Sequence, residues 1–460
     1  MATADSSTFL PRSAAKSDTI APPWGLAAYV AALLAGLIVA AVRYRLHPDF
    51  EMVAWRLALG VLCNASCAVL GCYLVLRRMS LLGDAISHAV LPGIIVAYLL
   101  SHELGGSAIL IGAAAVGLLT AILTQTLAST GRVSEDSGMG VVYTGLFAIG
   151  VILANQFAGR AHLDADCVLY GAIDLATVGT LPGEIPPGVI RLAIVFAVTI
   201  AFVITLWKEL KITAFDPALA RAMGVPVLLV HYALMTMVSI ASVAAFEVVG
   251  SILVVAMLIV PAATASLLTP RLSRMLLWAA AIGAGSGVIG DFLAAWMNTS
   301  VAGMMSVVAG LHLFVAVVVG LADRRRRNFS LALRIEAEDI LATLYRREEQ
   351  AASAAIHPRG VLRRIAEWTL RRRGLIASAP QGLALTAAGR RAARSLVRSH
   401  RLWEAYLEKH FDLPADHLHD PAERMEHFIT EEMQAELMAE LDGKTHDPHG
   451  RAIPEHRDSE

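Results

Sequence analysis

The stretch MMSVVAGLHLFVAVVVGLADRRRR, residues 304–327, decides the class of this protein. Its first 18 residues contain no Asp, Glu, Lys or Arg, and a bilayer core about 30 Å thick needs roughly 20 apolar residues per helical span. Four consecutive arginines follow, and basic clusters beside a span stay on the cytoplasmic side. The stretch therefore predicts a membrane helix whose C-terminal end, with the chain that follows it, is cytoplasmic.

Similar apolar runs recur upstream. They lie at 25–42, 55–76, 85–100, 106–127, 138–156, 188–207, 228–246, 249–268 and 275–296. Most are continuously apolar, whereas strands of a membrane barrel alternate in segments of about ten residues. Residues 25–322 are therefore predicted to form an all-α polytopic membrane domain with nine or ten transmembrane helices.

The composition of the whole chain agrees with this class. Of 460 residues 56% are hydrophobic and 17% are charged, whereas soluble proteins carry about 25% charged residues. Four cysteines exclude a disulfide scaffold.

The distribution of basic residues predicts the orientation of the spans. The loops on the same side as the four arginines carry further basic residues, Arg77, Arg78, Lys208 and Lys211. The positive-inside rule then predicts a multi-pass protein of the cell inner (plasma) membrane with both termini in the cytoplasm.

Two polar side chains fall within or beside the third apolar run. Asp84 and His88 are four residues apart, so on a helix they share a face. Ionisable residues within a membrane usually line a pathway, and a carboxylate with an imidazole suits Mn²⁺, Fe²⁺ or Zn²⁺. A helix-terminal charge beside a hydrogen-bonded histidine is the alternative. His312, alone in its span, is interpreted as a hydrogen-bonded core histidine.

A short polar segment at 214–226 separates two later spans. Asp216 is a good helix N-cap and Pro217 suits the first helical position. Gly224 stands where a helix would end. The pattern predicts a capped cytoplasmic helix, which is either a docking element or an ordinary surface helix. The candidate docking residues are Ala214, Phe215, Asp216, Pro217, Arg221 and Gly224.

Three segments together resemble the ABC-3 family, the permease subunits of ABC importers for manganese, zinc and iron. LRRMSLLGD (76–84), which runs into SHAVLPG (87–93), is similar to the family signature. Residues 214–226 are similar to its coupling helix, and VVGSILVVAMLIVPAATA (248–265) to a late-span motif. The resemblance implies the type II ABC importer permease fold. It also implies that Asp84 and His88 line the metal passage and that 214–226 docks on the ATPase.

The chain carries no phosphate-binding loop of its own. Gly443-Lys444-Thr445 follows Met438, where that motif needs its leading Gly. We therefore expect a transport subunit and not an enzyme, with ATP hydrolysed by a separate ABC ATPase subunit. The expected further partners are an extracytoplasmic metal-binding protein and a second permease subunit, identical or paralogous. No permanently bound cofactor is expected. The divalent metal, manganese before zinc or iron, is substrate and a possible regulator.

The last part of the chain is charged. Residues 324–401 carry 18 basic and 6 acidic residues, whereas 402–460 carry 5 and 16. The basic half predicts contact with DNA phosphates, anionic lipids or its own acidic half. The expected segments are a cytoplasmic N-terminal tail, the membrane domain, a basic linker, a cytoplasmic domain and a short end: 1–24, 25–322, 323–332, 333–454 and 455–460.

The cytoplasmic domain shows a candidate metal site. A helix is expected at 361–370, a hairpin wing at 374–389 and a long helix at 387–410. Glu423, Glu426 and His427 have i, i+3, i+4 spacing on a further expected helix, so they share a face. With His400 they suit Mn²⁺ or Fe²⁺, and a solvated acidic face is the alternative.

This domain resembles the diphtheria-toxin-repressor family of metal-dependent repressors. The similar segments are RSHRLWEAYL (398–407), ERMEH (423–427) and DPHGRAIP (447–454). The resemblance implies a small, mainly α winged-helix-like domain in which His400, Glu423, Glu426, His427 and Asp339 bind metal. Ala342 stands where the family has an acid or Met, and the segment before the wing is short for a helix-turn-helix. Binding to nucleic acid is therefore not expected.

These observations favour a permease subunit of an ATP-driven importer for divalent metal. Its tail is expected to sense cytoplasmic metal and to regulate transport. The alternative is a membrane-tethered metal-responsive transcription regulator, in which the spans serve as anchor and sensor. A secondary transporter is opposed by the docking segment.

Overall fold

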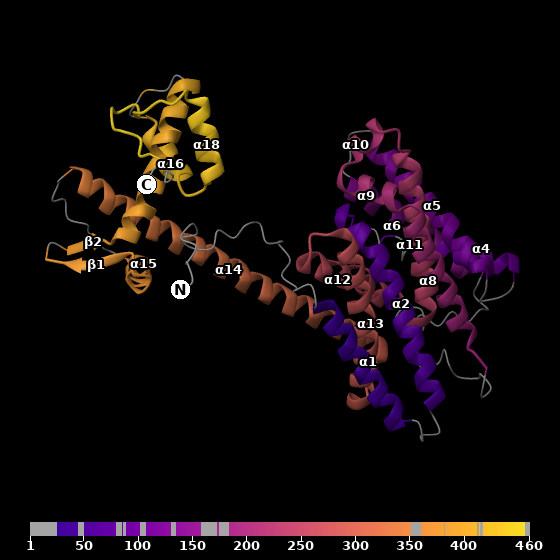
Figure 1. Cartoon of the computed structure of the whole chain (residues 1–460). Helices are drawn as coiled ribbons and strands as arrows, with labels where there is room; N and C mark the ends of the chain where they lie inside the picture. Colours follow the sequence, from indigo (N-terminus) through magenta and orange to yellow (C-terminus); the bar gives the residue numbers. More distant parts are fainter. Residues whose placement is uncertain are drawn as a thin grey trace. The chain divides into compact units, whose positions relative to one another are not determined.

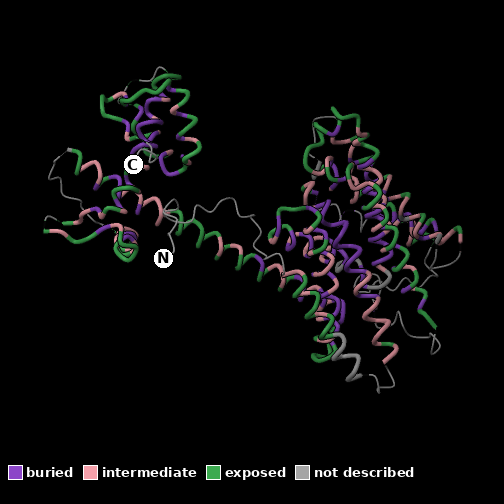
Figure 2. Tube along the Cα trace, viewed as in Figure 1, coloured by how far each residue is buried: buried purple, intermediate pink, exposed green. Residues whose placement is uncertain are grey.

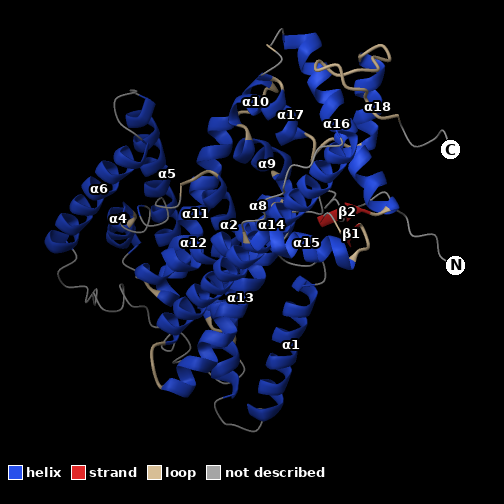
Figure 3. Cartoon of the chain, turned by 90° about the vertical axis from the view of Figure 1, so that its left-hand side faces the viewer, coloured by secondary structure: helices blue, strands red, loops and turns tan. Residues whose placement is uncertain are grey.

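The computed structural model describes residues 25–44, 50–79, 85, 89–101, 107–129, 135–157, 173, 184–350, 360–380, 382–411, 414 and 417–455. Asp84 and His88 lie outside the described residues. The chain divides into two compact units. Of the described residues, those up to Leu321 form one unit and those from Ala322 onward form the other. Helices dominate both units, and the described strands belong to the second (Figure 1, Figure 3).

The first unit is a helical bundle. Its helices are α1 (Gly25–Tyr44), α2 (Phe50–Leu76), α4 (Leu91–Ser101), α5 (Ser107–Ser129), α6 (Glu135–Phe157), α8 (Pro187–Thr205), α9 (Trp207–Phe215), α10 (Pro217–Ala222), α11 (Val227–Val249), α12 (Ser251–Leu268), α13 (Leu272–Met297) and the start of α14 (Val301–Gln350). Among the described residues, 7 helices are long and apolar enough to cross a membrane: α2, α5, α6, α8, α11, α13 and α14. The described apolar stretches of α1, α4 and α12 are shorter. The prediction of an all-α polytopic membrane protein is confirmed.

Helix α2 forms the centre of this bundle (Figure 2). Its residues 63–74 are buried without interruption, and α13, α12, α8 and α11 pack around it. Small residues allow the close approach: a Cβ on Gly71 would lie 1.7 Å from the carbonyl oxygen of Leu258 in α12. Close backbone contact through small residues is the usual way in which membrane helices associate.

Two sets of polar contacts join helices inside the bundle. Arg56 on α2 and Asp291 on α13 form a double contact, Nε to Oδ1 at 2.6 Å and Nη2 to Oδ2 at 3.2 Å. The side chain of Asp291 is only 1% exposed. His312 lies 2.9 Å from the Tyr29 hydroxyl through Nε2, and 2.9 Å from the Val308 carbonyl through Nδ1. The prediction that His312 is hydrogen-bonded is confirmed, and its side chain is half-buried.

The second unit joins a wing to a helical cluster. It contains α14 from Ala322 onward, α15 (Val361–Arg372), β1 (Ile376–Ala379), β2 (Gly382–Leu385), α16 (Ala387–Phe411), α17 (His419–Met425) and α18 (Glu431–Glu440). The strands pair antiparallel, Ile376 opposite Leu385 and Ala379 opposite Gly382. The wing, α15 and the second part of α14 share one apolar core, and α16 with α18 surrounds another. The expected mainly α winged-helix-like domain is confirmed.

Candidate functional site

The predicted docking segment is a capped helix, as its sequence indicates. The Asp216 carboxylate accepts hydrogen bonds from the backbone N–H of Ala218 at 3.0 Å and of Leu219 at 2.9 Å. Pro217 begins α10, and Gly224 follows it with a φ of 81°, in the left-handed region that favours glycine. The predicted cap, first residue and stop of this helix are confirmed.

The docking segment presents an apolar surface. Phe215, Leu219 and Met223 are 56%, 50% and 65% exposed, at intervals of four residues. The preceding helix α9 is held by the buried Leu210 and by a hydrogen bond of 2.8 Å from Arg77 to Thr213. Pro217 and Arg221 are exposed, and Ala214 is half-buried. Exposed apolar side chains on an anchored element are typical of a protein–protein contact.

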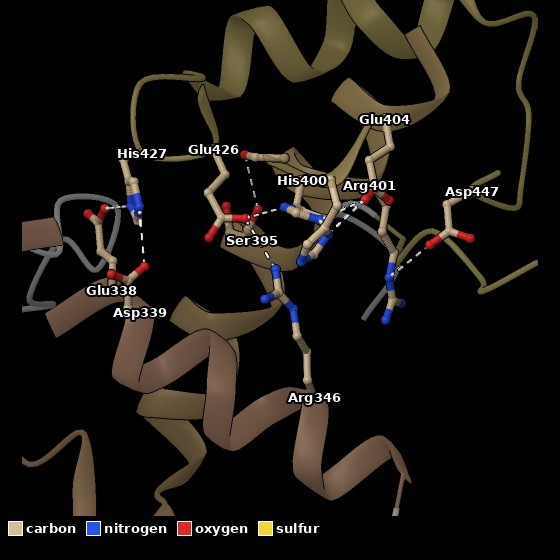
Figure 4. A network of polar contacts seen from close by, with 12 residues as sticks. Glu338, Asp339, Arg346, Ser395, His400, Arg401, Glu404, Glu426, His427 and Asp447 are labelled. Atoms are coloured by element: carbon tan, nitrogen blue, oxygen red, sulfur yellow. Dashed lines mark hydrogen bonds and ion pairs between the residues drawn. The ribbon is translucent and has the colours of Figure 1, made fainter. Parts of the chain in front are cut away.

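Two groups of potential metal ligands lie in the second unit (Figure 4). The first group is Asp339, Glu426 and His427, whose ligand atoms lie within 4.8 Å of one another. His427 places Nε2 3.3 Å from Asp339 Oδ1 and Nδ1 2.8 Å from Glu338 Oε2. Asp339 and Glu338 come from α14, and the other two residues come from the turn after α17.

The second group is His400, Glu404 and His419, with the same limit of 4.8 Å between ligand atoms. His400 and Glu404 are one turn apart on α16, with Nε2 and Oε1 separated by 3.0 Å. His419 begins α17 and places Nδ1 3.1 Å from the same Glu404 oxygen. His449, in the C-terminal turn, lies 3.7 Å from that oxygen through Nε2.

Glu426 joins the two groups. Its Oε2 lies 2.6 Å from His400 Nδ1, and Arg346 on α14 approaches the same oxygen with Nη2 at 3.3 Å. The side chain of Glu426 is 1% exposed, so these contacts take the place of water around a buried carboxylate.

The structure brings together four of the five predicted tail ligands. His400, Glu426, His427 and Asp339 are in contact as described, whereas Glu423 is exposed and belongs to neither group. Helix α17 ends at Met425, and the N–H of Glu426 still donates to the Ala422 carbonyl at 2.9 Å. Glu426 and His427 are buried in the turn that follows, whereas Glu423 is exposed.

Sequence reasoning missed Glu338, Glu404 and His419. The spacing of four residues between His400 and Glu404 was a usable local signal, since such pairs share a helical face. His419 carries no such signal, because it reaches the group only through the return of the chain after α16.

Hydrogen bonds set the charge state of these groups. Burial alone would lower the pKa of His427, but its contacts with Asp339 and Glu338 outweigh burial and raise that pKa to about 9. Burial likewise opposes protonation of His400, yet contacts with Glu404 and Glu426 raise its pKa above the ordinary value. Burial would raise the pKa of Glu404, but hydrogen bonds with His400 and His419 lower it. Without metal and below pH 9, the protonated imidazole of His427 thus offsets negative charge on Asp339 and Glu338.

The donor set fits a divalent transition metal. Imidazole nitrogens and carboxylate oxygens suit Mn²⁺, Fe²⁺ and Zn²⁺. Glu338 contacts the nitrogen of His427 that faces away from Asp339, and such a carboxylate partner orients a metal-binding histidine. Asp339, Glu426 and His427 could hold one ion, and His400, Glu404 and His419 another.

Residues 49–320 match the family model described as the ABC 3 transport family. The chain belongs to the ABC 3 transport family. The chain is 48% identical over 262 residues to the manganese transport system membrane protein MntD of Bacillus subtilis, covering 56% of this chain and 88% of MntD. It is 36% identical over 256 residues to the zinc transport system membrane protein TroD of Treponema pallidum, covering 55% of this chain and 70% of TroD.

A solved structure agrees with the ABC 3 transport family fold. PsaBC from Streptococcus pneumoniae in complex with Fab aligns with a TM-score of 0.51 and 30% identity, over 62% of this chain and 95% of that one. Separately, residues 386–455 match the metal binding and dimerisation domain of iron dependent repressors. That range includes His400, Glu404, His419, Glu426 and His427, whereas Asp339 precedes it.

Proposed function

We propose that this chain is the permease subunit of an ATP-driven importer for a divalent transition metal, manganese before zinc or iron. The family match over residues 49–320 carries the proposal, and relatives named for manganese, zinc and iron transport support the class of substrate. Uptake of radiolabelled Mn²⁺ by the reconstituted transporter, with Zn²⁺ and Fe²⁺ as competitors, tests it. Absence of ATP-dependent uptake of all three metals would overturn the proposal.

The proposed assembly contains three further components. An ABC ATPase docks on α10, an extracytoplasmic protein delivers the metal, and a second permease subunit completes the passage. We place the membrane domain at 25–322 in the inner membrane, with both termini and the 333–454 domain in the cytoplasm. The exposed apolar side chains of Phe215, Leu219 and Met223 support α10 as the ATPase contact.

Changes in the docking segment are expected to uncouple transport. Arg221→Glu reverses a charge on the exposed surface, and Gly224→Val places a branched side chain at a φ of 81°, where it is strained. We expect ATP-dependent uptake to fall about tenfold or more, which corresponds to about 1.4 kcal/mol of lost coupling. Co-purification of the ATPase and stimulated ATP hydrolysis measure the effect. Arg371→Glu, the same charge change at an exposed position of α15, is the control. Wild-type coupling in both docking variants would show that α10 is not the ATPase contact.

We further propose that the tail binds metal through the two groups around Glu426 and regulates transport. The burial of Glu426, His400 and Glu404 supports this, since a cluster of buried ionisable groups needs compensating charge. Glu423 stays a candidate ligand, which would have to turn inward to reach the ion.

Metal binding by the tail is expected to strengthen as pH rises. The pKa of His427 is about 9 in the metal-free protein, so below pH 9 an ion must displace its proton. Apparent affinity for Mn²⁺ should rise by about tenfold per pH unit from this group and level off above about pH 9. Calorimetry from pH 6.5 to 9.5 measures the slope. Glu338→Gln removes one of the contacts that raise this pKa, and should move the plateau to lower pH. An affinity that does not change with pH would rule out His427 as a ligand.

The regulator alternative requires recognition of DNA. Between the end of α14 and the wing, the described residues contain one helix, α15. The function assigned to the spans by their family match is transport, so we place the tail as a regulator of the permease and not of genes. Specific binding of a DNA operator by the purified chain would favour the alternative.

A further inference from the structure

One face of α14 carries both acidic and basic residues where it meets the metal-ligand groups. This face consists of residues spaced at i, i+3, i+7 and i+10, which are Asp339, Ala342, Arg346 and Glu349. Asp339 contacts His427, and Arg346 contacts Glu426. Glu349 contacts Arg401 on α16, with Nη2 and Oε2 separated by 2.5 Å. Ala342, which lies between Asp339 and Arg346, is 1% exposed and offers no ligand atom.

The positive charge of Arg346 faces a potential metal ligand. Its Nη2 lies 3.3 Å from Glu426 Oε2, the oxygen that also lies 2.6 Å from His400 Nδ1. Figure 4 shows the Arg346 side chain rising from α14 toward this carboxylate. An imidazole can give up its proton when metal binds, but a guanidinium keeps its charge at every physiological pH.

We propose that Arg346 competes internally with the metal for Glu426 and thereby weakens metal binding by the tail. This inference rests on the proposed metal-binding role of the tail. A divalent ion held by Asp339, Glu426 and His427 shares a carboxylate with a fixed cation. Glu426 is 1% exposed and the side chain of Arg346 is 22% exposed, so water screens the repulsion only in part.

The competition suits a sensor of metal excess. The imported ion is also a nutrient, so a regulatory site with very high affinity would be filled at the concentrations that the cell needs. A permanent charge beside the ligand raises the concentration at which the site fills without removing a ligand. The opposite role, in which Arg346 only positions Glu426 for the ion, predicts weaker binding when the arginine is replaced.

The test compares four full-length variants in detergent by Mn²⁺ titration calorimetry at fixed pH. His427→Ala defines the signal that does not come from the group of Asp339, Glu426 and His427. Arg346→Gln removes the charge and keeps hydrogen-bonding groups, whereas Arg346→Lys keeps the charge. Arg364→Gln removes a charge at an exposed position of α15. Circular dichroism checks that each variant retains its helical content.

We expect Arg346→Gln to bind Mn²⁺ at least about tenfold more tightly than the wild type does. Arg346→Lys and Arg364→Gln should stay within about twofold of wild type. Equal or weaker binding by Arg346→Gln, with the tail signal still lost in His427→Ala, overturns the competition and leaves the proposed function standing. Wild-type and Arg346→Gln titrations that both match His427→Ala overturn metal binding by the group of Asp339, Glu426 and His427 and, with it, the competition.

Discussion

Uptake of radiolabelled manganese is expected to fall to background when Asp84 or His88 is replaced by alanine. The two residues are four apart in a segment that follows the basic pair at 77–78 and leads into the apolar helix α4. An ionisable residue beside or within a membrane span is costly unless it serves a passage or a partner. We propose that both side chains bind the passing ion, so we expect the loss of either to leave it with too few ligands. Uptake by reconstituted vesicles, with ATP and the binding protein supplied, measures the effect.

Two measurements separate a passage defect from misfolding. Membrane insertion and co-purification with the ATPase should be unchanged in Asp84→Ala and His88→Ala. Ser87→Ala, which removes a polar hydroxyl between the two positions, is the matched control and should retain uptake. Normal uptake in both Asp84→Ala and His88→Ala would place the passage elsewhere.

Manganese transport is also expected to escape inhibition when the tail ligands are removed. In the wild type, the initial rate should fall severalfold as Mn²⁺ on the cytoplasmic side rises. A Glu426→Ala, His427→Ala variant should keep its initial rate, because these residues belong to the ligand group that α14 and α17 bring together. Vesicles preloaded with graded Mn²⁺ provide the measurement.

The control for this second experiment is Glu432→Ala, which removes an exposed carboxylate from α18. It should slow with internal Mn²⁺ as the wild type does. Glu423→Ala is measured beside it: loss of inhibition would show that this exposed residue turns inward to bind the ion. If wild type and the double variant slow to the same degree, the tail does not regulate transport.

Much of the fold follows from short-range sequence patterns. Each apolar run predicted as a span overlaps a helix of the structure, since a continuous apolar segment about 30 Å long has few alternatives to a helix in lipid. The sequence predicts helix α10 together with its N-cap, because the hydrogen bonds that Asp216 accepts come from only two and three residues along the chain. The wing also depends on contacts between residues near in sequence, with Gly382 at its turn.

The ligand groups depend on contacts that no local pattern encodes. Spacing predicts Glu423, Glu426 and His427 as ligands, with His400 on the preceding helix. In the structure helix α17 ends at Met425, and Glu423 is exposed and belongs to neither ligand group. The sequence by itself determined the membrane helices, the docking helix and the types of ligand. Tertiary structure alone placed His419 beside Glu404, Glu338 beside His427 and Arg346 against Glu426. The physical reason is distance along the chain: periodicity and capping act within a few residues, whereas Arg346 and Glu426 meet across 80 residues through packing of the whole unit.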